Sequence, residues 1–536
     1  MKVTFVYTED ESLGLQYLSG ILKKHGHQTE LIFDPALFND NILPIKPLSK
    51  FFNFEDQIVE DIIDSKPDII GFSLLTDIYP WFRRIASKIK KMTNIPIVVG
   101  GIHATSVPDI VIQENFVDFL IVGEGEFPLL ELINRLEGDR DFEMVPSLWY
   151  KKNDEVKRTA ILPKITNLDE IPVPDKDLFY DKAPMFQKNY FIEAARGCVF
   201  KCTFCHHSIS KDIPQTKRSY RMRSVKSVID ELKMAKQKYN IHSVYFTDEL
   251  FALDMDWMRE FVPAYREQVG LPYSCSVYPS MMDEERVILL KNSFCFGVEM
   301  GVQTINTDLK KQLNRFETNA RVEKIIGLLK KHGIRVYTQN IMALPGEREE
   351  HLKEMLEFYT RVKPTVSFFF WLRYYPRTAV VSDALKMGIL TQDQVLQIEK
   401  GEITGGINTG GTFLGKYADK YFLVLNLSKY LPLGFVRFLI HRNLIRFIPV
   451  LPLRSINMVF IFFAQRFTEF LPSKYGSKIY RFNRDIARYQ HYIFRKIFSL
   501  GRKKRNNPET KISEMNTLLE PKVYVGPPEN ILRVKA

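Results

Sequence analysis

The first 138 residues alternate between short apolar runs and amphipathic stretches. Residues 13–26 (LGLQYLSGILKKHG) carry apolar side chains at helical spacing and end in glycine. Continuous apolar runs precede and follow this stretch, at residues 3–8, 30–34, 68–75, 95–101 and 119–126. Such runs are typical of parallel strands buried on both faces. The alternation predicts a doubly wound, Rossmann-like α/β domain at residues 1–138, with ligands beyond the carboxyl ends of its strands.

Small residues stand at the predicted carboxyl ends of these strands. They are Thr8, Ser73, Gly100, Gly101, Gly123 and Gly125. Small side chains let a large flat ligand approach the backbone, but they are also common in ordinary strand-to-helix turns. Their spacing alone leaves both interpretations open.

A second strand–helix alternation follows a segment rich in Pro, Lys and Asp. Residues 139–183 predict a linker that contains one short strand at 147–152. The apolar runs of the second alternation lie at residues 190–197, 243–251, 273–277, 295–303, 334–344 and 367–375. With helices between most of them, they predict a partial (β/α)6 barrel at residues 184–390. In such a barrel the chemistry lies at the carboxyl ends of the strands.

The C-terminal region, residues 391–536, predicts a basic, aromatic, mainly helical segment that ends in a disordered tail. Residues 430–505 contain sixteen Lys and Arg residues but only two acids, Glu469 and Asp485, so this region accounts for the whole net charge of +12. The rest of the chain is near neutral, which argues against nucleic-acid binding. The longest uncharged run within residues 430–505, at 455–465, is too short to span a bilayer. Amphipathic helices of this kind favour peripheral contact with an anionic membrane through residues 430–505. The alternative is a helical cap on the barrel with a solvated basic side.

Three of the five cysteines lie within eight residues, in the stretch RGCVFKCTFCHH. A structural zinc site needs four ligands and disulfides need pairs, so Cys198, Cys202 and Cys205 indicate a metal centre with one open position. The N-terminus, MKVTFVYTED, has no apolar signal-peptide core. Together with the small number of cysteines, this predicts a protein of the reducing cytoplasm, with some contact at the inner face of the cell membrane.

The C-x3-C-x2-C spacing after a predicted strand resembles that of the radical S-adenosylmethionine (SAM) enzymes. The resemblance implies a 4Fe–4S cluster held by Cys198, Cys202 and Cys205, whose fourth iron chelates the amino and carboxylate groups of SAM. It also implies one-electron cleavage of SAM to methionine and a 5′-deoxyadenosyl radical, which abstracts hydrogen from an unreactive C–H bond. The implied electron donor is of the flavodoxin or ferredoxin type.

Further positions match this family along the predicted barrel. The resemblance places Phe204 near the adenine, and Asp248 and Glu249 (FTDEL) near the methionine amino group. It assigns Glu299 and Gln303 (GVEMGVQ) to the ribose and Ile341, in QNIMALPGE, to the adenine. Ala343 replaces the first glycine that this last turn usually carries.

The N-terminal domain resembles the cobalamin-binding domain that is fused to one class of radical SAM enzymes. The resemblance rests on LGLQYLSGILKKHGH, PDIIGFS, IVVGGIHAT and VDFLIVGEGE. It implies a cobalamin site formed by Thr8, Gly14, Ser73, Gly100, Gly101, His103, Gly123, Glu124 and Gly125. The Asp-x-His-x-x-Gly motif that supplies an axial histidine is absent from the first loop, which reads TEDESLG. We therefore expect no histidine below the cobalt, and we expect His103 to be a loop hydrogen-bonding residue.

The two resemblances together imply methylation of an unactivated carbon, and the basic aromatic C-terminal region suggests a hydrophobic or lipid substrate. The alternative within the same superfamily is an oxidative cyclase or another C–C bond-forming enzyme, including the anaerobic porphyrin-ring cyclases. A methylthiotransferase is excluded because it needs three further cysteines upstream of Cys198. The complete cysteine triad disfavours a non-catalytic cobalamin carrier or sensor, and the bulky aliphatic C-terminal region disfavours a tRNA-modifying enzyme. Cys275 and Cys295, in predicted strands, are interpreted as small apolar fillers, with a radical-quenching or substrate-binding role as the alternative.

Overall fold

The computed structural model describes residues 1–39, 45–153, 155–209, 220–403, 417–449, 487–494 and 496. The chain divides into two compact units, residues 1–488 and 489–536, and the first contains both α/β domains. Most of the basic region at 430–505, the uncharged run at 455–465 and the polar tail lie outside the described residues.

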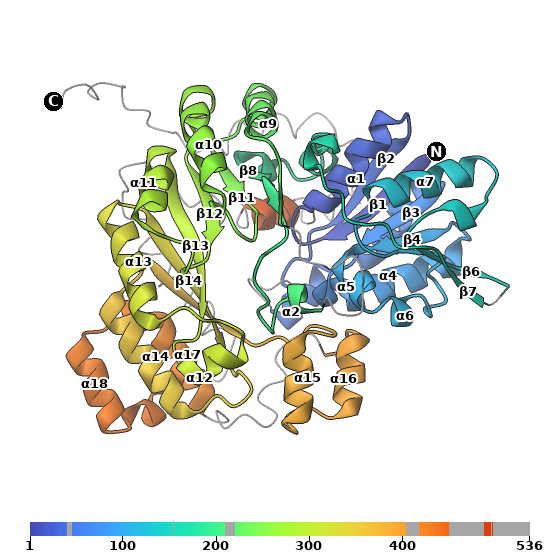
Figure 1. Ribbon diagram of the computed structural model, residues 1–536. Coiled ribbons are helices and arrows are strands. Elements are labelled where there is room, and N and C mark those ends of the chain that lie inside the picture. Colours follow the sequence, from blue (N-terminus) through green and yellow to red (C-terminus); the bar gives the residue numbers. More distant parts are fainter. Residues whose placement is uncertain are drawn as a thin grey trace. The chain divides into compact units, whose positions relative to one another are not determined.

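The N-terminal domain is built on a seven-stranded sheet in the order β2-β1-β3-β4-β5-β6-β7 (Figure 1). Its strands are β1 (Lys2–Thr8), β2 (Gln28–Asp34), β3 (Ile69–Ser73), β4 (Ile97–Gly100), β5 (Phe119–Ile121), β6 (Leu148–Lys152) and β7 (Glu155–Arg158). The first five strands are parallel, and β6 and β7 continue the sheet antiparallel. The doubly wound prediction is therefore confirmed. The strand expected within the linker is β6, so part of that segment extends this sheet.

Helices cover both faces of this sheet. They are α1 (Leu13–Lys24), α2 (Lys46–Phe51), α3 (Glu55–Asp64), α4 (Tyr79–Met92), α5 (Gly101–Ser106), α6 (Pro108–Val111) and α7 (Glu126–Glu137). Figure 1 shows α1 and α7 on one face and α4 on the other. The Ser12 side chain accepts a hydrogen bond from the Leu15 N–H and so caps α1. The longer helices α1, α3, α4 and α7 turn their apolar stripes inward, which leaves the carboxyl ends of β1, β3, β4 and β5 for loops.

The second domain is a six-stranded parallel sheet whose strands follow one another in chain order. They are β8 (Asn189–Ile192), β11 (Ser243–Phe246), β12 (Tyr273–Val277), β13 (Cys295–Gln303), β14 (Arg335–Met342) and β15 (Val366–Trp371). Within the described residues, β8 and β15 each pair with one strand only, so the barrel is open. This confirms the partial (β/α)6 barrel.

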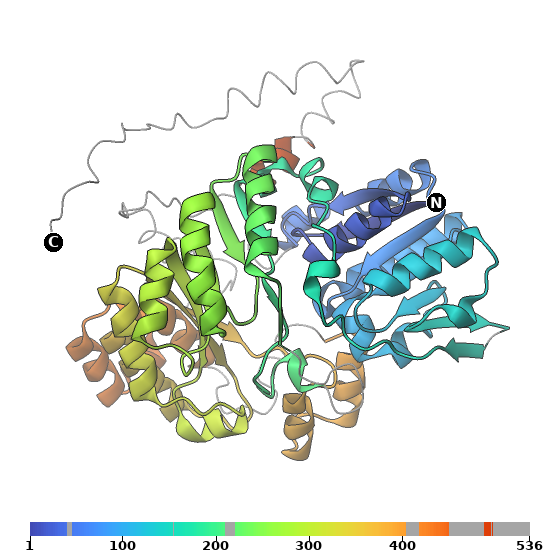
Figure 2. The same cartoon turned by 45° about the horizontal axis from the view of Figure 1, so that its top comes forward.

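The barrel helices form an outer layer, which both views show as a row of neighbouring helices (Figure 2). They are α9 (Val225–Lys238), α10 (Met255–Gln268), α11 (Glu284–Asn292), α13 (Asn319–Lys331) and α14 (Glu349–Val362). Two short helices, α8 (Asp177–Tyr180) and α12 (Thr307–Gln312), lie before β8 and after β13. Caps from Ser224, Asp254, Asp283 and Thr318 begin four of the five outer helices.

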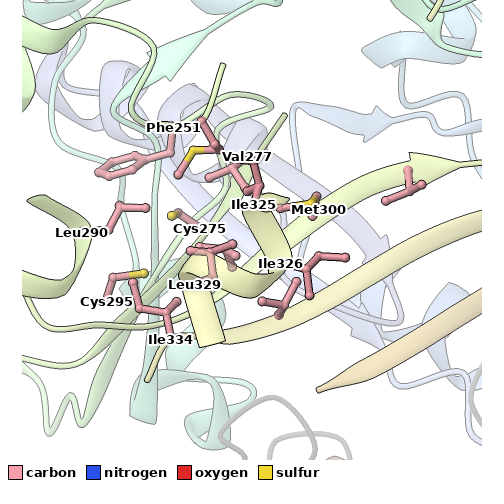
Figure 3. Packing of buried hydrophobic residues seen from close by; sticks show 14 of the residues in the cluster. Phe251, Cys275, Val277, Leu290, Cys295, Met300, Ile325, Ile326, Leu329 and Ile334 are labelled. Atoms are coloured by element: carbon pink, nitrogen blue, oxygen red, sulfur yellow. The ribbon is translucent and has the colours of Figure 1, made fainter. Parts of the chain in front are cut away.

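The core between the barrel strands and helices contains both remaining cysteines (Figure 3). Cys275 is fully buried on β12, and Cys295 is 1% exposed on β13. Figure 3 shows them among apolar side chains such as Leu290, Ile325 and Leu329. Burial of this kind agrees with the interpretation of both thiols as apolar fillers.

The described part of the C-terminal region is helical. Its elements are α15 (Ala379–Lys386), α16 (Gln392–Glu399), α17 (Ala418–Leu427) and α18 (Leu433–His441). Both α17 and α18 pack on α14. None of the described helices is both long enough and apolar enough to cross a membrane.

Candidate cofactor sites

All three clustered cysteines lie on one loop at the carboxyl end of β8. We call residues 197–220 the cysteine loop. A short antiparallel ladder closes its base, because β9 (Ala195–Arg196) pairs with β10 (Arg221–Met222) and sets Arg196 opposite Arg221. The two ends of the cysteine loop therefore lie side by side. This pairing holds the described part of the loop at the carboxyl ends of the barrel strands.

The surroundings of the three thiols fit an iron–sulfur cluster. Cys202 is buried, Cys198 and Cys205 are half-buried, and all three belong to one cluster of packed residues. Burial raises the pKa of all three thiols, that of Cys205 to about 12. Three thiolates in these surroundings are therefore costly without a compensating metal charge, and thiolates are the ligands that such clusters use. The Cys205 sulfur also lies within 4.8 Å of ligand atoms of His206 and His207.

A cationic group that the sequence did not indicate lies beside Cys202. The buried guanidinium of Arg315 donates toward the Cys202 sulfur at 3.7 Å and pairs with Glu317 at 2.8 Å. Arg315 lies 4.3 Å from the ring centroid of Tyr278, which itself stacks on Phe200 at 3.8 Å. The Tyr278 hydroxyl donates to the second Glu317 oxygen at 2.8 Å. Tyr278 directly follows β12, and Arg315 and Glu317 follow α12, so the spacing within a helix or strand does not predict that these residues meet at the cysteine loop.

The residues expected near methionine lie just after β11. Asp248 is 2% exposed and accepts a hydrogen bond from the Ala194 N–H at 3.2 Å, and burial raises its pKa well above the usual value. Its second oxygen has no partner in the described structure. Glu249 pairs with His207 at 3.2 Å, beside the cysteine loop. A buried carboxylate oxygen without a partner fits a position that binds a ligand amine.

The residues expected near the nucleoside lie on β13 and β14. The Gln339 amide donates to the Glu299 carboxylate at 2.7 Å, and Gln303 adopts a φ of +66° at the end of β13. Ile341 packs in the same group of apolar residues as Phe204. Ala343 adopts a φ of +64°, and its N–H donates to the buried Glu347 at 2.6 Å.

A cavity of about 250 Å³ lies beyond the carboxyl ends of the N-terminal sheet. Seven of the nine residues expected to bind cobalamin line it: Gly14, Ser73, Gly100, Gly101, Gly123, Glu124 and Gly125. Apolar side chains such as Phe5 and Val99 form the rest of the sheet side. We call this space the cobalamin cavity. Arg196 and Glu193 of the barrel domain also line it, so the cavity wall reaches the base of the cysteine loop.

Two glycines of the cavity wall have no room for a side chain. A Cβ on Gly71 would lie 2.9 Å from the Phe5 ring. A Cβ on Gly101, whose φ is +92°, would lie 2.7 Å from the Leu74 nitrogen. Glycine at these two positions lets neighbouring segments of the wall pack closely, and a wall with small residues at the strand ends fits a large flat ligand such as a corrin or its nucleotide tail.

The two other expected cobalamin residues, Thr8 and His103, are not among the residues that line the cavity. His103 is fully buried, lies 3.2 Å from the Thr76 hydroxyl and packs on the Tyr79 ring at 4.3 Å. Burial lowers its pKa to about 4, so the imidazole is neutral at physiological pH. These contacts agree with the prediction that His103 is a loop hydrogen-bonding residue.

Two known families match the two α/β domains. Residues 4–133 match the B12 binding domain, and residues 192–359 match the radical SAM superfamily. The chain is thus a radical SAM enzyme that also carries a B12-binding domain. The cofactors of these two domains are cobalamin, SAM and a 4Fe–4S cluster.

Two relatives represent different chemistries. The chain is 26% identical to an uncharacterized methyltransferase of Pyrococcus horikoshii over 393 residues, 72% of this chain and 81% of the relative. It is 28% identical to the anaerobic magnesium-protoporphyrin IX monomethyl ester cyclase of Rubrivivax gelatinosus over 402 residues, 70% of this chain and 68% of the relative. Among solved structures, the cobalamin-dependent SAM radical enzyme OxsB, with aqua-cobalamin and SAM bound, shares the fold with a TM-score of 0.62. That likeness covers 96% of this chain and 83% of OxsB at 16% identity.

Proposed function

We propose that this enzyme methylates an unactivated carbon of a hydrophobic substrate. The observation that carries the proposal is the wall shared by the two sites. Arg196 lines the cobalamin cavity and stands two residues before Cys198. When bound, the cofactors supply one-electron cleavage of SAM and a transferable methyl group. The chain's own task is to hold the substrate carbon between the two sites and to exclude water.

The inner face of the barrel favours an apolar substrate. Parallel pairing sets Phe370 of β15 beside Ile341 of β14 and Phe368 beside Gln339, so these four side chains share one face of the sheet. Phe368 and Phe370 stack at 6.1 Å, and Phe370 is 52% exposed. This stacked pair, half-buried at Phe368 and exposed at Phe370, lies beside the expected adenine position and would cover a flat or aliphatic substrate.

The reaction is tested with anaerobically reconstituted enzyme, a strong reductant, SAM carrying a deuterated methyl group, and lipid and metabolite extracts. We expect a product that gains the labelled methyl group, together with 5′-deoxyadenosine. An unlabelled product that has lost hydrogens would instead support the cyclase chemistry of the Rubrivivax gelatinosus relative. Formation of no 5′-deoxyadenosine would contradict both reactions. The flavodoxin- or ferredoxin-type electron donor is tested by replacing the chemical reductant with each protein.

We further propose that the substrate is reached at a membrane surface. In the described C-terminal region, α18 turns Val436 inward and leaves Phe435 and Phe438 47% and 51% exposed. Phe447, which follows, is 78% exposed, and Arg442 is exposed between them. Exposed aromatic residues next to basic ones favour an anionic lipid interface.

Flotation with vesicles tests this contact. The full chain should float with vesicles that contain phosphatidylglycerol and much less with phosphatidylcholine alone. Replacing Phe435 and Phe438 with serine should weaken flotation without altering cluster content. Flotation that is unchanged in this variant and after deletion of residues 430–505 would remove the membrane argument.

A further inference from the structure

Two arginines at the base of the cysteine loop face two carboxylates of the cobalamin domain. Arg196 and Arg221 are cross-strand neighbours in the β9–β10 ladder. Arg196 pairs with Glu126 at 2.7 Å. Arg221 reaches both oxygens of Glu124, at 2.7 and 3.1 Å. We call these four residues the arginine–glutamate clamp.

The carboxylate side of the clamp belongs to the cobalamin cavity. Glu124 stands between Gly123 and Gly125 in the loop after β5, and Glu126 begins α7. Gly123, Glu124, Gly125 and Glu126 all line the cavity. Glu124 also accepts a hydrogen bond from the Ile165 N–H at 2.7 Å, which ties the linker to the same carboxylate. The clamp therefore joins the cavity loop, the linker and the cysteine loop.

The clamp is largely withdrawn from water. The side chains of Arg221 and Glu126 are 8% and 6% exposed, and that of Arg196 is 13% exposed. Burial opposes ionisation of Glu124, but the hydrogen bonds and charge of Arg221 hold its pKa below the usual value. Arg196 further pairs with Glu193 at 2.7 Å and lies 5.1 Å from the Tyr17 ring centroid. Buried two-point contacts of a planar guanidinium fix orientation as well as distance.

We propose that the arginine–glutamate clamp is a positioning device that fixes the cobalamin cavity relative to the cysteine loop, and so sets the separation of cobalt and cluster. The inference depends on the cofactors of the two domains and holds for methylation and cyclisation alike. Two other ion pairs that join the barrel directly to the cobalamin domain, Arg373–Asp77 and Arg377–Asp109, are more exposed. In the pair Arg377–Asp109, the side chains are 38% and 47% exposed, and neither residue lines the cavity. The clamp is thus a buried contact at the point where the two cofactor loops meet.

The test uses holoenzyme with cob(II)alamin and the reduced cluster, both of which are paramagnetic. Their spin–spin coupling falls steeply with distance, so electron paramagnetic resonance reports the separation directly. We expect a single defined coupling in the wild type and a broadened or weakened one in Arg221→Gln. Iron, sulfide and cobalamin contents should remain within 2-fold of the wild type.

Two further variants complete a double-mutant cycle. Glu124→Gln should broaden the coupling as Arg221→Gln does, and the double variant should be no worse than either single one, because the pair acts as a unit. Arg377→Gln is the matched control and should leave the coupling unchanged. Hydrogen exchange of the protein without cofactors gives a second readout. In Arg221→Gln and Glu124→Gln, the amides of residues 121–126 and 194–197 should exchange at least 5-fold faster than in the wild type. This measurement remains possible if a variant no longer binds its cofactors.

The proposal is overturned if Arg221→Gln and Glu124→Gln keep the wild-type coupling and amide exchange. It is also overturned if Arg377→Gln changes both readouts as strongly. In that case any contact between the domains would fix the cobalamin cavity relative to the cysteine loop, and the clamp would have no particular role.

Discussion

Both sheets of this enzyme present the carboxyl ends of parallel strands to cofactors, but they do so by opposite means. The N-terminal sheet offers space, because small residues such as Ser73, Gly100 and Gly123 line the cobalamin cavity. The barrel offers donor groups, with three thiols on one loop and the carboxylates of Asp248 and Glu249 beside it. One site thus depends on small residues that leave room for a ligand, and the other depends on side chains that bind it. Substitutions should therefore affect them differently.

The largest expected effect comes from removing a donor. Cys202→Ala takes away one of three cluster ligands, so iron content should collapse and cleavage of SAM should fall to background. Cobalamin should still bind, because the cobalamin cavity does not include Cys202. Iron analysis, 5′-deoxyadenosine formation and a cobalamin titration measure the three quantities. Retained iron together with retained cleavage would contradict the assigned role of the cysteine loop.

The next effect comes from adding an atom to the site that depends on space. Gly101→Ala places a Cβ 2.7 Å from the Leu74 nitrogen at a φ of +92°. We expect a loss of about 1–3 kcal/mol in the free energy of unfolding and weaker cobalamin binding, with an intact cluster. Thermal unfolding and cobalamin titration are the measurements.

Gly327→Ala is the control for this change. Gly327 lies in α13 of the barrel, outside the cobalamin cavity, and an added Cβ there has no neighbour within 4 Å beyond its own helix. If both variants bind cobalamin equally well, close packing at Gly101 does not shape the cavity.

A smaller effect is expected when the cation beside the cluster is removed. Arg315→Gln takes away a positive charge that would stabilise the more negative, reduced cluster. The midpoint potential should fall by on the order of tens of millivolts at unchanged iron content. A redox titration followed by electron paramagnetic resonance measures it. Lys311→Gln, which removes an exposed cation from the same segment, should leave the potential where it was.

The smallest effect is expected in the barrel core. Cys275→Ala should lower the free energy of unfolding by about 1 kcal/mol through a small cavity and leave SAM cleavage unchanged. Cys295→Ala should behave alike. Normal 5′-deoxyadenosine formation with loss of the final product would instead assign a catalytic role to that thiol.

The sequence predicted the parts of the enzyme that repeat. Strand-like runs such as residues 95–101 and 334–344 indicated parallel strands. Their alternation with helical stretches predicted the doubly wound domain and the partial barrel. Cysteine spacing indicated the metal site because ligand spacing is local. The sequence did not predict the roles of Arg315, Glu317 and Tyr278, because only the tertiary fold brings these residues to Cys202. Thr8 remains a prediction: it is 3% exposed and is not among the residues that line the cavity, because a strand end does not show which way its side chain points.

The backbone at Ala343 has a consequence for handling the enzyme. An alanine with a φ of +64° holds a conformation that glycine adopts without strain, in a turn anchored by Glu347. Ala343→Gly would release that strain, by about 1 kcal/mol. Residue 343 lies outside the cysteine loop and the cobalamin cavity. Ala343→Gly is therefore a starting point for a more stable variant that withstands the long anaerobic purifications such enzymes require.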